Sequence, residues 1–110
     1  MRQYVIDELR YQDFEKLKKH FETHFEKSPI EGIFYLSLGE DQLTEIQKEH
    51  VSCQPFCFYL DLEETKLSCE LLIKSSKKLR CECTAFATEK QRNFLISSVD
   101  MLLAKLEIIN

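Results

Sequence analysis

Residues 56–74 read FCFYLDLEETKLSCELLIK, and this stretch decides the fold. Apolar residues alternate with other residues on both sides of a polar turn at Glu63-Glu64. Alternation with a period of two is typical of strands that bury one face, so the stretch predicts two antiparallel strands joined by a short turn. One face would carry Phe56, Phe58, Leu60 and Leu62 from the first strand and Leu67, Cys69, Leu71 and Ile73 from the second.

The flanking segments extend this sheet in both directions. After a second turn at residues 75–78, the alternation continues through residues 79–86 and predicts a third strand of a meander. Upstream, residues 32–38 (GIFYLSL) predict one more strand. We therefore expect an antiparallel sheet of about four strands. Residues 3–9 fit either a short strand or an extended lead-in.

Three helices are predicted around the sheet. Apolar residues recur at spacings of three and four from Phe14 to Phe25, which indicates a helix that Ser28-Pro29 terminates. The segments Thr44-Glu-Ile-Gln47 and Thr88-Glu-Lys-Gln91 have the form of capping boxes. They predict a short helix from Glu45 to about His50 and a long one from Glu89 to about Glu107. The whole predicts a single α+β domain over residues 1–110, a two-layer sandwich with the N- and C-terminal helices on one sheet face.

Composition and charge narrow the classes of function. The net charge of −4 does not suit a phosphate backbone, so we expect no nucleic-acid partner. The longest uninterrupted apolar run, Phe56 to Leu60, is five residues, far short of the roughly 20 that span a membrane. Charges near the N-terminus do not fit a signal peptide. A cytoplasmic location with five reduced cysteines is the expectation.

Several cysteine and histidine residues could in principle form a metal site or a reactive thiol. The donors fall in the patterns His50-x-x-Cys53-x-x-x-Cys57 and Cys81-x-Cys83, without the paired Cys-x-x-Cys spacing of structural zinc sites. Strand parity also places Cys57 and Cys81 on opposite sheet faces. We therefore expect Cys69, Cys81 and Cys83 to pack in the core, and no metal to be bound. Cys53 is the one reasonable thiol nucleophile, in a loop where simple exposure is the commoner explanation.

Two histidines, His20 and His24, lie four residues apart on the first helix, a spacing that can present two imidazoles to one metal. The sequence between them lacks the glutamate of the His-Glu-x-x-His zinc-peptidase pattern, because Phe21 follows His20 directly. We expect these histidines to rest beside the apolar stripe with their nitrogens in water.

The sheet face opposite the helices is the feature that most resembles a binding surface. Aromatic and arginine side chains in an apolar centre with a charged rim are typical of protein interfaces. The predicted partner-binding residues are Tyr35, Tyr59, Leu72, Arg80 and Phe86, with Glu70, Lys74 and Glu82 around them. The alternatives are that the short middle helix covers these side chains, or that they are scattered and without a role.

The sequence thus favours a non-catalytic protein-interaction or regulatory module that binds a protein partner or forms a homodimer, through this face or through the C-terminal helix and Ile108-Ile109. We expect no catalytic residue and no cofactor. The alternative is a thiol- or zinc-dependent protein that uses Cys53, Cys57 and a histidine. The element order is similar to that of frataxin-like domains and of the dimeric chaperones of bacterial secretion systems, a likeness without a shared motif.

Overall fold

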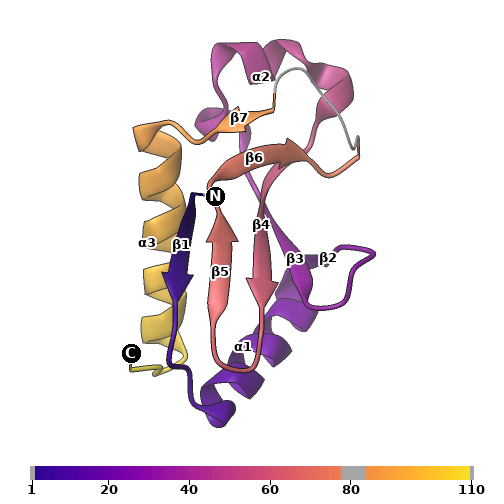
Figure 1. Cartoon of the computed structure of the whole chain (residues 1–110). Coiled ribbons are helices and arrows are strands. Elements are labelled where there is room, and N and C mark those ends of the chain that lie inside the picture. Colours follow the sequence, from indigo (N-terminus) through magenta and orange to yellow (C-terminus); the bar gives the residue numbers. More distant parts are fainter. Residues whose placement is uncertain (1, 78–83, 110) are drawn as a thin grey trace.

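The structure, a computed structural model, describes residues 2–77 and 84–109 (Figure 1). Within these residues the chain forms three α-helices, two short 3₁₀ helices (η) and seven strands. In order they are β1 (Gln3–Ile6), α1 (Tyr11–His24), β2 (Glu26–Lys27), β3 (Ile33–Ser37), η1 (Glu40–Gln42), α2 (Glu45–Glu49), η2 (Val51–Cys53), β4 (Phe56–Leu62), β5 (Leu67–Glu70), β6 (Leu72–Ser75), β7 (Ala85–Phe86) and α3 (Glu89–Lys105). The α+β class is confirmed, whereas the prediction of about four strands is wrong.

Strand β4 is the centre of the sheet. The order is β1-β5-β4-β3-β2, with β6 paired to β4 and to β7, and every pairing is antiparallel. Figure 1 shows α1 and α3 behind the sheet, so the face turned toward the viewer carries neither of them. The short helix α2 lies at the upper end, beyond β7, and does not lie over this face.

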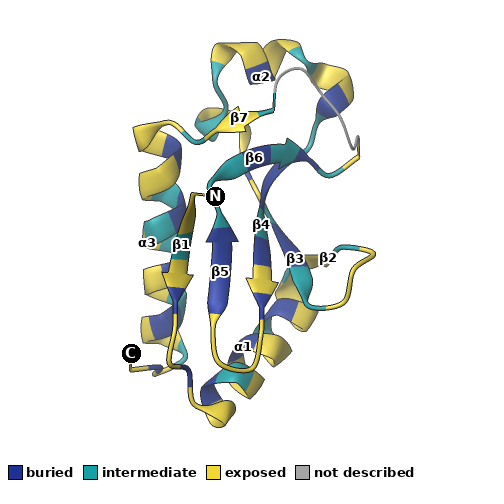
Figure 2. Ribbon diagram, viewed as in Figure 1, coloured by how far each residue is buried: buried dark blue, intermediate teal, exposed yellow. Residues whose placement is uncertain are grey.

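The core lies between the sheet and the two long helices. The alternating side chains of β4 and β5 that were predicted to share a face are buried together. In Figure 2, β5 and much of β4 are therefore dark blue. This one cluster joins Phe56, Phe58, Leu60, Leu62, Leu67 and Cys69 of the sheet to Leu17 and Phe21 of α1 and Leu95, Val99 and Leu103 of α3. Full burial of one such apolar side chain stabilises the fold by roughly 1.5–3 kcal/mol.

The second predicted strand is broken into β5 and β6 by a bend at Leu71. The pairs Leu60–Cys69 and Cys57–Lys74 show that β4 advances three residues while its partner advances five, so two extra residues are accommodated at the bend. The Leu71 N–H donates to the carbonyl of Arg2 (3.1 Å), and its carbonyl accepts from the N–H of Ala87 (2.7 Å). These bonds satisfy the bent backbone and turn β6 toward β7, and the even number of extra residues preserves the predicted faces.

Element boundaries differ modestly from the prediction. Helix α1 ends at His24, ahead of Ser28-Pro29, because Glu26–Lys27 pair with Phe34 and Tyr35 as a strand. The ambiguous N-terminal segment is strand β1. Residues 79–83 of the third predicted meander strand lie outside the described residues. Among the described helices, none combines the length and apolar character that a membrane crossing requires.

Both predicted capping boxes are confirmed, and they touch each other. Thr44 with Gln47 caps α2, and Thr88 with Gln91 caps α3. The Gln91 side-chain amide donates to Gln47 Oε1 (2.9 Å) and to the Gln42 carbonyl (2.8 Å). Gln47 and Gln91 are only 3% and 1% exposed, so a hydrogen-bonded polar junction is buried between two helix starts that are far apart in sequence.

We predict that Gln91→Ala destabilises the protein by about 1–3 kcal/mol, because it removes the partner of the buried Gln47 Oε1 and the partly buried bonds to the Gln42 carbonyl and the Thr88 N–H. Urea unfolding followed by circular dichroism would measure the loss. Gln12→Ala, at an exposed position of α1, is the matched control and should have little effect. Equal effects of the two substitutions would show that the junction adds nothing beyond ordinary helix propensity.

Candidate functional site

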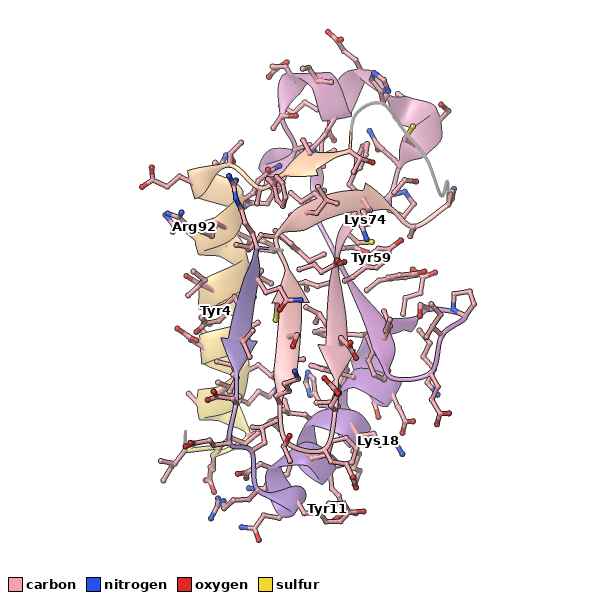
Figure 3. The ribbon with its side chains drawn as sticks, viewed as in Figure 1. Tyr4, Tyr11, Lys18, Tyr59, Lys74 and Arg92 are labelled. Atoms are coloured by element: carbon pink, nitrogen blue, oxygen red, sulfur yellow. The ribbon has the colours of Figure 1, made fainter. Side chains whose placement is uncertain are left out.

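A groove of about 810 Å³ lies on the sheet face opposite α1 and α3. We call it the tyrosine groove. It is lined by Gln3, Ser28, Pro29, Ile30, Ile33, Tyr35, Tyr59, Asp61, Ser68, Glu70, Lys74, Ser75, Ser76 and Lys77. Figure 3 shows Tyr59 and Lys74 close together on this face, with Lys74 above the tyrosine ring in that view. The volume falls within the range of roughly 300–1,000 Å³ that is usual for ligand sites.

Two tyrosines form the floor of the groove. Tyr35 and Tyr59 are directly opposite each other on β3 and β4, and their ring centroids are 5.0 Å apart. Tyr35 is 9% exposed and Tyr59 is half-buried. Burial is the main cause, and the proximity of Tyr35 the second, of a rise in the pKa of Tyr59 to about 12. Its hydroxyl therefore stays neutral at physiological pH. The floor is thus an aromatic surface on which the Tyr59 hydroxyl is neutral and donates to the Ser75 carbonyl (3.4 Å).

Lys74 closes one end of this floor. Its Nζ lies 4.6 Å from the centroid of the Tyr59 ring, a cation–π distance, and 3.1 Å from Glu70 Oε2. The side chains of Lys74 and Glu70 are 30% and 17% exposed. Because both partners are partly withdrawn from water and hold each other, Lys74 is fixed in place with most of its charge compensated.

Asp61 stands at the other end of the groove, opposite Ser68 in the β4–β5 register. Partial burial of its carboxyl group, and then the nearby charge of Glu63, raise the pKa of Asp61 above its ordinary value, while Lys66 acts in the opposite direction. Lys66 is itself paired with Glu63 at 3.6 Å. No lysine, arginine or histidine forms an ion pair with Asp61 within residues 2–77 and 84–109.

The loop between β2 and β3 forms a side wall. Ser28 Oγ accepts from the N–H of Ile30 (3.0 Å) and donates to the Ile30 carbonyl (2.9 Å), which closes a compact turn. Gly32, at φ +87°, lets its carbonyl accept from the N–H of Leu62 (2.9 Å). The loop is therefore tied to the end of β4 and presents Ile30, 64% exposed, along the groove.

We predict that Gly32→Ala destabilises the protein by about 1–2 kcal/mol, because a side chain is disfavoured at positive φ. A new Cβ would also approach the Leu62 carbonyl oxygen to 3.3 Å. Chemical denaturation would measure the change. Gly39→Ala is the control at φ −73°, where alanine is allowed. Its Cβ would approach Asp41 Oδ1 to 3.0 Å, but the Asp41 side chain is exposed and can move aside, so this substitution should cost clearly less. Equal costs would show that the left-handed conformation does not govern this turn.

The sequence-predicted partner-binding residues divide into two groups. Tyr35 and Tyr59 meet in the tyrosine groove as expected. Leu72 and Phe86 are opposite each other on β6 and β7, outside the groove, and the Arg2 guanidinium lies 4.5 Å from the centre of the Phe86 ring. Arg80 lies outside the described residues. The middle helix does not cover this face, so the groove wall comes instead from Pro29 and Ile30, which carry no sequence signal beyond a turn.

The described thiols are poorly suited to chemistry. Cys53 is 3% exposed and belongs to the core, so the expectation of an exposed loop cysteine is wrong: η2 folds its side chain inward. Cys57, though on the outer parity of β4, is fully buried, and burial raises its pKa and that of Cys69 to about 12. Cys69 packs in the core as predicted, while Cys81 and Cys83 lie outside the described residues. No group of three metal-binding side chains occurs in the part of the chain that the structure describes.

We predict that Cys53, Cys57 and Cys69 resist iodoacetamide in the folded protein, because all three side chains are buried away from the reagent. For Cys57 and Cys69 the raised pKa also leaves little thiolate. All three should be alkylated in urea. Peptide mass mapping reports each cysteine separately, so the other cysteines serve as internal comparisons. Rapid labelling of Cys53 under native conditions would contradict its burial and restore the thiol hypothesis.

The two histidines of α1 contact each other, and the centroids of the His20 and His24 rings are separated by 4.5 Å. His20 is half-buried and lies edge-on to Phe25 at 5.8 Å. Burial, and then the charges of His24 and Lys105, lower the pKa of His20 below its ordinary value. The environment of His20 therefore favours its neutral imidazole.

We predict that the free energy of unfolding decreases as the pH falls below about 6.5, the ordinary pKa of histidine. In this window the unfolded chain binds a proton at His20 that the folded chain excludes, so acid favours unfolding. His20→Gln should reduce this slope between pH 7.5 and 5.5, as measured by urea unfolding at each pH. An unchanged slope would show that His20 has its ordinary pKa in the folded protein.

No protein-family model, curated protein or solved structure significantly matches this chain. The case for function therefore rests on the geometry of the tyrosine groove and on the chemistry of the side chains around it.

Proposed function

We propose that this protein is a non-catalytic protein-interaction module of the cytoplasm, and that it binds an extended segment of a partner protein in the tyrosine groove. The observation that supports this best is the pair of tyrosines on a sheet face that α1, α2 and α3 leave open. A held lysine and an apolar loop flank the pair. Aromatic anchors in a preformed hollow are typical of the centres of protein interfaces.

The dimensions of the groove suit a short stretch of extended chain. It follows β4 from Asp61 to the level of Pro55, whose carbonyl accepts from the N–H of Ser76 (3.0 Å). At about 3.4 Å per residue, this distance corresponds to roughly 20 Å, or about six residues of a bound strand. The wall formed by the Ser28–Gly32 loop is held by its own hydrogen bonds, so the site is largely formed before binding.

The thiol and zinc alternative has less support. Cys53 and Cys57 are both buried, and the pKa of Cys57 is raised, which disfavours a nucleophilic thiolate. Three free cysteines in the described residues fit the reducing compartment that the sequence predicts. A non-catalytic role in the cytoplasm agrees with both observations.

A selection of random peptides displayed on phage, followed by NMR mapping on the labelled protein, tests the proposal. Selected peptides should shift the amide signals of β3, β4 and the Ser28–Gly32 loop. Ile30→Ser should weaken their binding about tenfold or more, as expected for loss of an apolar contact of about 1.4 kcal/mol. Ile46→Ser is the matched control, since Ile30 and Ile46 are 64% and 61% exposed but only Ile30 lines the groove.

Two outcomes would overturn the proposal. Selected peptides that map elsewhere, or that bind equally to the Ile30→Ser and Ile46→Ser variants, would show that the groove is not the interface. Native mass spectrometry of the protein without peptide tests for the homodimer that the sequence also allows. A dimer that Ile30→Ser dissociates would identify the occupant of the groove as a second copy of the chain.

A further inference from the structure

We infer that the segment bound in the tyrosine groove carries a lysine or arginine that pairs with Asp61, and an apolar side chain two residues away that packs on Tyr35 and Tyr59. This inference rests on the proposed function, because it specifies the chemistry of the partner at the same site. It follows from the distribution of charge around the groove and from the spacing of side chains along β4.

Two carboxylates line the groove, and within residues 2–77 and 84–109 Glu70 has an ion pair whereas Asp61 has none. Lys74 pairs with Glu70 at 3.1 Å, and Lys66 pairs with Glu63 at 3.6 Å. Both nearby lysines are therefore engaged, and Asp61 keeps an exposed carboxylate with no ion pair from the described residues. A cationic side chain from a partner is the complement to this position, and the chain's net charge of −4 favours the approach of a basic segment.

The distance between the acidic and aromatic parts of the groove fixes the spacing in the partner. Asp61 and Tyr59 lie on the same face of β4, two residues apart. The separation is about 7 Å along the strand, the same as between alternate side chains of any extended peptide. A segment aligned with β4 therefore places a basic residue on Asp61 and an apolar residue on the tyrosines when one residue separates the two.

The end of the groove at Lys74 is poorly suited to binding an acidic segment. Lys74 already donates to Glu70 and lies over Tyr59, so an incoming carboxylate would have to displace an existing ion pair. Lys77, at the margin of the groove, is exposed to water and offers a weaker, salt-screened attraction. Acidic segments are thus disfavoured relative to basic ones.

Parallel phage selections against the wild type, Asp61→Asn and Glu64→Gln test the inference. Peptides selected on the wild type should be enriched in a lysine or arginine one residue removed from an apolar residue. Asp61→Asn should weaken these peptides about tenfold or more, and raised salt should have the same direction of effect. Glu64→Gln removes one exposed carboxylate outside the groove and should leave binding unchanged.

The outcomes separate this inference from the proposed function. Peptides that map to the groove but lack a basic residue, or bind the Asp61→Asn variant equally well, would overturn the inference while the groove stands as an interface. Failure of every selected peptide to map to the groove would overturn the proposed function itself. Asp61→Lys supplies a second check, since it should lose the basic peptides and select acidic ones.

Discussion

The burial of one face of β4 is the constraint on which the rest of the structure depends. Phe56, Phe58, Leu60 and Leu62 all point to the same side and are at most 6% exposed. A shift of one residue in the register would move these side chains into water, so the pairings with β3, β5 and β6 are fixed by the same requirement. The same parity places Tyr59 and Asp61 on the opposite face. The groove is therefore a geometric consequence of how the core is formed.

Much of the fold could be predicted because its signals are local. The alternation in residues 56–74 and the two capping boxes each lie within a few neighbouring residues, and the structure confirms them. The break at Leu71 could not be predicted, since its cause is hydrogen bonding to Arg2 and Ala87, which are distant in the sequence. The strand Glu26–Lys27 was missed for the same reason: it exists only because β3 pairs with it.

In the candidate site, too, the residues set by local sequence could be predicted and those set by distant contacts could not. Tyr35 and Tyr59 follow from strand parity, so their shared face could be predicted. The role of Ile30 could not, because it depends on where a turn held by Ser28 and Gly32 places one side chain against a distant strand. No sequence motif singles out Asp61. Its significance depends on the pairing of both neighbouring lysines with other carboxylates, which only the three-dimensional arrangement shows.

The junction between Gln47 and Gln91 has a consequence for folding. Helix α2 has five residues, too few to persist alone, and the partner that completes its buried cap arrives 44 residues later in the chain. The start of α2 is thereby coupled to the start of α3, so the hydrogen bond between Gln47 and Gln91 forms only when both helix starts are in place. We expect the two ends to exchange their amide hydrogens as one cooperative unit, although they belong to separate helices.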